Sequence, residues 1–235
     1  MKLSLPRTNG RLVATLATLL FAPVLGRAAT VIDQVPYTIT ASGVYELQSN
    51  LTSNVAGVDA ITVLAANVVI NLNGYTLSTT KFNVDFGIDV EAPNVTVRNG
   101  TVSSFQVEVK LGNSQGKAQD LNLRDTRGLV GLAVAGNDNA VVNCFIIGSG
   151  EALPNDYAIQ VLSGNCLVKD NQISQCHFAI AVVSSVVSAF IQNYVANSRF
   201  GILMTGSDYY QGNVATNCPT AFGGGHAIGT ENGGD

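Results

Sequence analysis

The sequence predicts an all-β, single-domain protein built as a parallel β-solenoid of about seven or eight coils. Three observations support this fold class. A short apolar segment recurs at intervals of 19 to 27 residues. Each unit contains two or three short strands with alternating apolar residues, and none shows a helical period. Most units also close on Asn or Asp, as in LNGY (72–75) and RNGT (98–101).

Residues 1–28 are expected to be a signal peptide that is removed before the protein folds. A basic start with Lys2 and Arg7 precedes the apolar run LVATLATLLFAPVL (12–25), and cleavage is expected after Ala28. No later stretch is long and apolar enough for a transmembrane helix. The sequence therefore predicts a secreted or periplasmic protein without a transmembrane segment.

Charge excludes one class of partner. The chain has 12 Lys and Arg residues against 16 Asp and Glu residues. The leader holds four of the basic residues and none of the acidic ones, which leaves 8 against 16 and a net charge of −8. Nucleic-acid binding requires clustered Lys and Arg, so no nucleic-acid partner is expected.

The solenoid is predicted over residues 29–222, with a Gly-rich tail at 223–235. The segment YTITASGVYELQSNL (37–51) is expected to form two strands that cap the first coil. Asn and Gly suit the bends because both tolerate a left-handed backbone. Stacking buries the apolar face that one unit cannot bury alone. The predicted inward residues are Ile61, Ile88, Val107, Leu132, Ile159, Ile180 and Ile202.

Two stretches carry a resemblance to a known family. ITVLAANVVINLNGYTLS (61–78) and GIDVEAPNVTVRNGTVS (87–103) resemble the repeats of right-handed parallel β-helix proteins of the pectate-lyase-like superfamily. The resemblance covers residues 37–222 and implies right-handed winding and an association with polysaccharide. It specifies the fold far more than the chemistry. An antiparallel sandwich or barrel is the competing all-β interpretation, but it does not predict units of the same internal order.

The cysteines are predicted to be buried thiols. Cys176 aligns with Ser198 and then with Cys218, so these two cysteines are two coils, or roughly 9.6 Å, apart. This distance is too long for a disulfide. The sequence has no CxxC motif and two histidines, so it offers no pattern for a zinc or copper site. The four cysteines are Cys144, Cys166, Cys176 and Cys218.

Carboxylates are predicted to gather on the outward columns of the second and third coils. One column is aligned as Thr62, Asp89 and Glu108, and the next contains Glu91 and Lys110. Stacked carboxylates repel one another unless a cation holds them or one takes a proton. The alignment thus predicts a calcium site at Asp89, Glu91 and Glu108, or an acid/base pair.

A second outward column is aligned as Arg98, Arg124, Asn143 and Lys169. The resemblance to pectate lyases implies that Arg98 or Arg124 abstracts the proton alpha to a uronate carboxylate. The alternative is that both charged columns are solvated outer faces with ordinary ion pairs. The candidate catalytic residues are Arg98, Arg124, Asp89 and Glu108. The candidate substrate-binding residues are Lys110, Lys169 and Tyr157.

Function has three open interpretations. The first is an exported protein that binds or acts on polysaccharide, with calcium-assisted uronate elimination as one mechanism. The second is a non-catalytic scaffold or interaction protein that self-associates through its end coils. The third is a polygalacturonase-like hydrolase, because GGGHAIG (223–229) is similar to the Gly-His-Gly segment of those enzymes; the paired-aspartate motifs are missing, however. Short loops favour binding or structure over catalysis, and whether the chain is an enzyme stays open.

Overall fold

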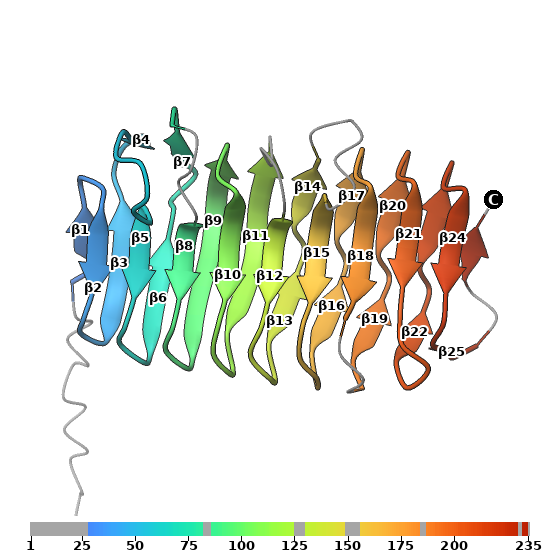
Figure 1. Cartoon of the computed structure of the whole chain (residues 1–235). Helices are drawn as coiled ribbons and strands as arrows, with labels where there is room; N and C mark the ends of the chain where they lie inside the picture. Colours follow the sequence, from blue (N-terminus) through green and yellow to red (C-terminus); the bar gives the residue numbers. More distant parts are fainter. Residues whose placement is uncertain are drawn as a thin grey trace, which may run out of the picture.

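The computed structural model describes residues 28–81, 86–124, 130–148, 156–183, 187–229 and 232–234. Over these residues the backbone forms 26 short β-strands and no helix. The strands wind into a parallel β-solenoid of about eight turns, which confirms the predicted fold class (Figure 1). The predicted signal peptide lies outside the described residues except for Ala28.

Nine parallel strands, one from each successive winding, form sheet B. They are β2 (Tyr37–Ile39), β5 (Ile61–Val63), β8 (Phe86–Val90), β10 (Val107–Leu111), β12 (Val130–Val134), β15 (Tyr157–Val161), β18 (Phe178–Val182), β21 (Phe200–Leu203) and β24 (Thr220–Gly223).

Sheet A has 17 strands and covers the other sides of the rod. They are β1 (Thr30–Ile32), β3 (Gly43–Leu47), β4 (Leu51–Ser53), β6 (Val68–Asn71), β7 (Thr76–Thr79), β9 (Val95–Ser103), β11 (Lys117–Arg124), β13 (Ala140–Val142), β14 (Phe145–Ile147), β16 (Leu167–Lys169), β17 (Gln172–Ser174), β19 (Ala189–Ile191), β20 (Tyr194–Ala196), β22 (Tyr209–Gln211), β23 (Val214–Thr216), β25 (His226–Ala227) and β26 (Gly233–Gly234).

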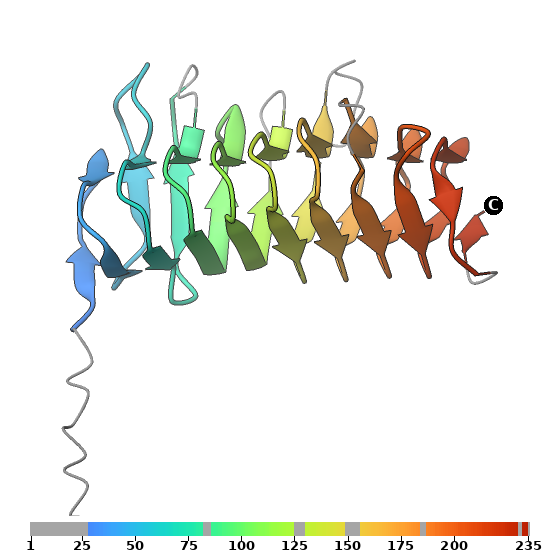
Figure 2. The same cartoon turned by 90° about the horizontal axis from the view of Figure 1, so that it is seen from below.

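The chain winds in one direction along the rod. Sheet B strands run downward at the front of Figure 1, and sheet A strands run upward behind them as the coils advance from left to right. This winding is right-handed. The coils lie side by side along the axis, with the first and last described coils at opposite ends of the rod (Figure 2).

The predicted inward column is confirmed with one exception. Ile88 pairs with Ile61 on one side and with Val109, not Val107, on the other. The prediction for the third coil is therefore wrong by two residues. Two consecutive residues are buried at this point of each strand, Gly87 with Ile88 and Glu108 with Val109, so the alternation is interrupted and does not specify the register. All the residues of the corrected column are fully buried.

Asn and Asp residues occupy the bends, as predicted. One column of bends has φ between 53° and 60°, in the left-handed region where Asn and Asp are the most tolerant residues after Gly. Its members are Asn99, Asp120, Asn143, Asp170 and Gln192. Repeated Asn and Asp thus mark corners of the coil.

Strands begin within the predicted range of the solenoid and continue past its predicted C-terminal bound at residue 222. The first winding includes β1, which pairs with β3 ahead of the predicted cap segment. At the other end, β25 pairs with β22, and β26 pairs with β23. Strands thus continue into the segment that we expected to be a Gly-rich tail.

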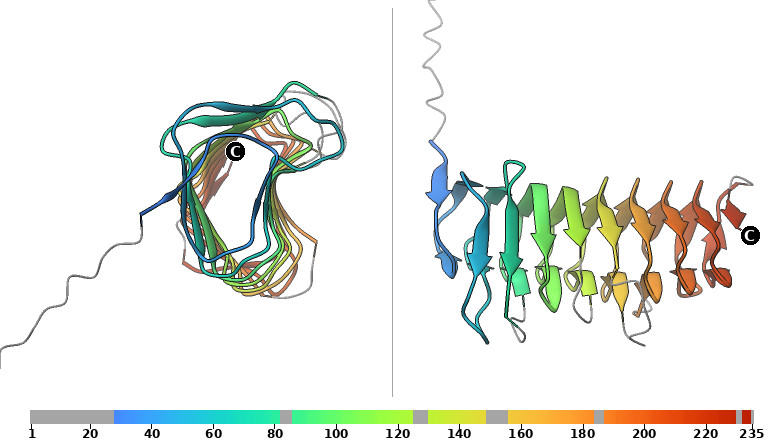
Figure 3. Two further views of the ribbon diagram at one scale, coloured as in Figure 1. Left: turned by 90° about the vertical axis from the view of Figure 1, so that its left-hand side faces the viewer. Right: turned by 90° about the horizontal axis from the view of Figure 1, so that it is seen from above.

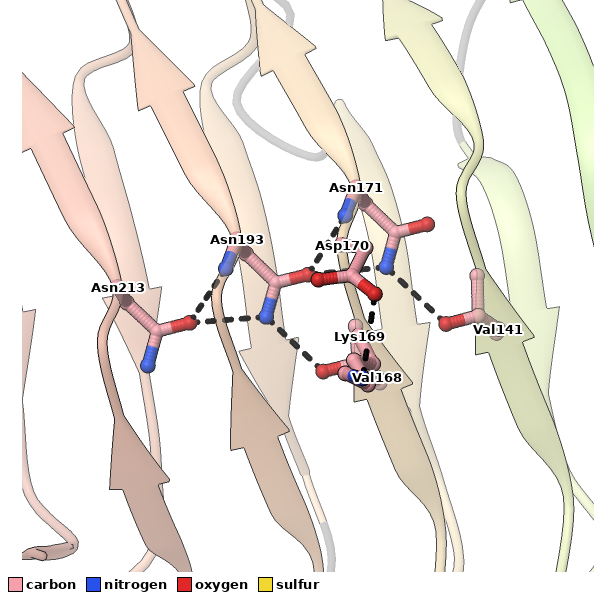
Figure 4. Close-up of polar contacts among 7 residues, drawn as sticks. All are labelled: Val141, Val168, Lys169, Asp170, Asn171, Asn193 and Asn213. Carbon is pink, nitrogen blue, oxygen red and sulfur yellow. Dashed lines mark hydrogen bonds and ion pairs between the residues drawn. The ribbon is translucent and has the colours of Figure 1, made fainter.

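A buried amide ladder connects the last coils (Figure 4). Asn171, Asn193 and Asn213 are at most 1% exposed. The Asn171 Nδ2 donates to Asn193 Oδ1 at 2.9 Å, and the Asn193 Nδ2 donates to Asn213 Oδ1 at 2.9 Å. The Asn193 Nδ2 also donates to the Val168 carbonyl at 2.9 Å. Each amide thereby satisfies buried groups in the coils before and after it.

Replacing the middle amide should destabilise the protein strongly. In Asn193→Ala, the Asn171 backbone N–H loses its acceptor, and the change removes four hydrogen bonds in all. We expect the free energy of unfolding to fall by about 2–4 kcal/mol, because buried donors are left unpaired. Urea denaturation followed by circular dichroism measures the change. In the matched control, Gln172→Ala, an exposed amide is removed, and the change should stay within about 0.5 kcal/mol.

Candidate functional site

The outer face of sheet B carries a column of aromatic rings. Tyr157, Phe178 and Phe200 begin β15, β18 and β21 and pair with one another in register. Their ring centroids are 4.7 and 4.8 Å apart, with interplanar angles of 13° and 11°. The His177 ring centroid lies 4.6 Å from that of Phe178, and the Arg199 guanidinium lies 5.5 Å from the Phe200 centroid. All three stacked rings are partly exposed.

Apolar side chains continue this face beside the aromatic column. Ala181 and Leu203 pair in the next outward column. Leu162 and Val183 follow β15 and β18 directly and are 40% and 61% exposed. Exposed aliphatic residues next to half-exposed rings make this part of the surface apolar, and contiguous apolar surface commonly marks a binding site.

The same face is charged nearer the N-terminus. The Lys110 Nζ lies 3.1 Å from Asp89 Oδ1 and donates a hydrogen bond to Asp89 Oδ2 at 3.3 Å. The Lys110 ammonium also lies 4.8 Å from the Phe86 ring centroid. Asp89 is only 3% exposed, so the lysine compensates a nearly buried carboxylate.

The predicted alignment of Glu108 beside Asp89 is wrong. Lys110 takes that place in the column, and Glu108 lies opposite Gly87. A Cβ at Gly87 would lie 2.7 Å from Val102 Cγ1 and 2.9 Å from Phe105 Cδ2, so this column faces the core. The Glu108 side chain is fully buried. The error has the same two-residue origin as the error at Val107.

The predicted calcium ligands do not surround one point. Glu108 is in the interior, Asp89 is paired with Lys110, and Glu91 is exposed one residue beyond β8. Within the described ranges, no group of three His, Cys, Asp or Glu residues could hold a metal ion. Calcium binding by this protein stays an untested prediction.

The predicted cation column is partly wrong. Arg98 and Lys169 do share a column, but Gln119 and Val142 lie between them. Arg124 pairs with Ser103 in the second half of β9, five residues beyond Arg98. The segment KAQD (117–120) at the start of β11 lacks the apolar alternation of the other strands. The sequence therefore did not indicate the correct register there. Both arginines belong to sheet A, whereas Asp89 belongs to sheet B.

The candidate substrate-binding residues are separated as well. Tyr157 and Lys110 lie on sheet B, two strands apart. Lys169 is on sheet A, where its Nζ lies 3.3 Å from Asp170 Oδ2. Their proposed roles stay predictions, but the structure does not bring the three together.

The two histidines have different surroundings. His177 packs against the aromatic column, and partial burial lowers its pKa, with the nearby Arg199 charge acting in the same direction. His226, the residue of the polygalacturonase-like segment, is exposed on β25, and its ring lies 6.0 Å from that of Tyr209. The Asp156 charge acts on the His177 pKa in the opposite direction and raises it.

All four thiols are buried, as predicted. Ser198 lies between Cys176 and Cys218 in their column, and its Oγ accepts a hydrogen bond from the Cys176 N–H at 3.3 Å. Burial raises the pKa of Cys144 to about 12 and also raises the pKa of Cys166 and Cys176. The thiolate forms are therefore scarce at neutral pH.

The aromatic column was missed by the sequence analysis, although a signal for it exists. An aromatic residue stands two positions before the inward Ile in FGI (86–88), YAI (157–159), FAI (178–180) and FGI (200–202). The predicted register rests on the inward positions, and Tyr157 is the one residue of this column with a predicted role. Stacking of the rings depends on register, which this short motif does not specify.

Comparison with known proteins finds no match of this chain to a protein-family model, a curated protein or a solved structure. The resemblance to the pectate-lyase-like superfamily is thus supported by the fold alone. No helix of the described residues meets the length and hydropathy needed to span a membrane.

Removing the Lys110 charge should destabilise the face of sheet B. In Lys110→Met, Asp89 keeps a nearly buried charge without this counterion, and we expect a loss of about 1–2 kcal/mol. The loss is below that of a fully buried pair because the Lys110 side chain is 27% exposed. The double variant Asp89→Asn/Lys110→Met should recover part of it in urea unfolding. Lys169→Met, which removes an exposed pair, serves as the control.

Thiol chemistry tests the burial of the cysteines. Burial raises the pKa of Cys144, Cys166 and Cys176, so the native protein should react with Ellman's reagent far more slowly at neutral pH than the unfolded protein does. In guanidinium chloride all four cysteines should react at once. A cysteine that reacts in the native protein as fast as in the unfolded one would contradict this assignment.

Proposed function

We propose that this protein is a non-catalytic polysaccharide-binding solenoid, exported from the cytoplasm, that binds its ligand along the outer face of sheet B. The observation that carries the proposal is the aromatic column at Tyr157, Phe178 and Phe200, flanked by exposed aliphatic side chains. Ligand sites in general combine apolar and aromatic side chains with a few polar groups.

The spacing of the column supports a polymeric ligand. Adjacent strands are about 4.8 Å apart, so equivalent groups recur at that interval along the rod. An extended polysaccharide repeats one sugar over a similar length. A chain lying parallel to the axis would therefore meet the same contact on each coil, and several weak contacts add up along the face.

Stacking of the three aromatic rings limits how a sugar can contact them. Both faces of the Phe178 ring are covered by its neighbours, whereas Tyr157 and Phe200 each have one face outside the stack. The apolar C–H groups of the sugars would thus rest on ring edges and on Leu162 and Val183. The Tyr157 hydroxyl and the Gln160 amide offer hydrogen bonds in the same part of the sheet.

The separation of the charged groups supports binding over elimination. A uronate lyase needs its base and its carboxylate-neutralising cation at one point of the substrate. Arg98 and Arg124 belong to sheet A, whereas Asp89 belongs to sheet B and is already paired with Lys110. The solenoid therefore supports a binding role more directly than a catalytic one.

Binding to polysaccharides tests the proposal. The exported protein is incubated with cellulose, chitin, xylan, polygalacturonate and alginate, and the bound fraction is measured by co-sedimentation or affinity electrophoresis. Phe178→Ala should weaken the binding by about fivefold or more, because it interrupts the column. Tyr194→Ala removes an aromatic residue that is 46% exposed on sheet A, and it should leave the binding unchanged.

A lyase assay decides the non-catalytic part of the proposal. Polygalacturonate and alginate are followed by the ultraviolet absorbance of unsaturated uronate, with calcium and then with a chelator. We expect no activity. Activity that is lost on chelation and in Asp89→Ala would show that the protein is an enzyme, and no binding to any polymer would leave the scaffold interpretation.

A further inference from the structure

A strip of side chains runs along the outer face of sheet B, beside the aromatic column. It has one member on each of β12, β15, β18 and β21, and adjacent members are about 4.8 Å apart. The members of this strip are Ala133, Gln160, Ala181 and Leu203. Seen along the rod axis, successive coils lie behind one another, so the strip runs parallel to the rod (Figure 3).

The alanines of the strip lie lower than the side chains on either side of them. Ala133 and Ala181 are only 6% and 5% exposed. On one side the rings of the aromatic column are partly exposed, and on the other side Leu162 and Val183 are 40% and 61% exposed. A sugar chain that contacts both exposed rows would therefore direct substituents into the space above the two alanines.

Gln160 is the polar member of the strip. Its side chain is partly exposed and lies between the two alanines. Among the described residues the Gln160 amide makes no hydrogen bond with another side chain or with the backbone. The amide offers N–H donors and a carbonyl acceptor. A ligand group that covers it must supply partners, because an amide that is buried without a hydrogen bond costs free energy.

An acetamido group fits this combination of side chains. It carries a carbonyl acceptor and an N–H donor for the Gln160 amide, together with a methyl group that can pack on Ala133 or Ala181. A hydroxyl in its place would bury no apolar surface against the alanines. On the basis of the polysaccharide-binding function proposed above, we propose that the strip selects polysaccharides of N-acetylated amino sugars and that Gln160 binds the acetamido group.

The strip offers no counter-charge to an acidic sugar. The strands β12, β15, β18 and β21 contain no charged residue. Arg199 precedes β21, and its guanidinium packs against the Phe200 ring, across the aromatic column from the strip. Asp125, Arg127 and Glu151 lie in adjoining segments outside the described residues, so the test includes charged sugars.

A matched pair of oligosaccharides tests the proposal. Chitohexaose and cellohexaose share a β-1,4-linked backbone and differ in the group at C2, which is an acetamido group in the first and a hydroxyl in the second. Isothermal titration calorimetry of the exported protein should show chitohexaose binding about tenfold or more tighter than cellohexaose. The hexamers of glucosamine and of galacturonate, which carry positive and negative charges, should both bind more weakly than chitohexaose.

Variants separate the choice of sugar from binding as such. Gln160→Leu keeps a side chain of similar size and removes the hydrogen bonds, so the preference for chitohexaose should fall to about threefold or less while cellohexaose binding changes little. Phe178→Ala should weaken both oligosaccharides alike. Gln172→Leu makes the same replacement at an exposed site on sheet A and should change neither affinity. Circular dichroism and the melting temperature show that each variant is folded.

The failure of this proposal differs from the failure of the polysaccharide-binding function. Equal affinity for chitohexaose and cellohexaose, or tighter binding of the galacturonate hexamer, would overturn the selection of acetamido groups and leave polysaccharide binding standing. A preference for chitohexaose that survives in Gln160→Leu would overturn the role of Gln160. Binding of none of the four oligosaccharides would overturn both proposals.

Discussion

The hydrogen bonding of each coil to the next is the constraint on which the rest of this structure depends. Parallel strands are held about 4.8 Å apart, so every residue of one coil lies directly beside its register partner in the next. Side chains are thereby arranged in columns, and the successive residues of each column must pack against one another over several coils. The left-handed bends at Asn99, Asp120 and Asn143 satisfy this requirement at one corner. The aliphatic columns satisfy it in the core, where successive layers bury one another.

The same constraint explains the buried polar groups. Where a coil bends inside the protein, its backbone N–H groups find no acceptor in a neighbouring strand. The amide side chains of Asn171, Asn193 and Asn213 accept these bonds and also bond to one another. Asp208 has the equivalent role at another corner, where it accepts hydrogen bonds from the backbone of Ser188 and Thr205. Polar residues are thus part of the core, because a ladder with every member satisfied is stable at low dielectric.

Columns of side chains on the surface depend on the same register, and they connect the fold to the proposed function. Identical spacing makes the aromatic stack of sheet B continuous, and a continuous stack suits a ligand that is itself periodic. A polymer that lies along the rod is therefore the kind of ligand that we propose for this architecture.

The sequence by itself determined the solenoid, the burial of the four thiols and the positions of many bends. These features depend on local preferences: apolar alternation within a strand, and the tolerance of Asn and Asp for a left-handed backbone. The tertiary structure decided which residues share a column. At Val107 the alternation is interrupted by two consecutive buried residues, Glu108 and Val109, so the local pattern did not show that Glu108 lies in the core and Lys110 beside Asp89. Register depends on packing between coils across the whole cross-section, and a site made of columns therefore cannot be derived from the repeats alone.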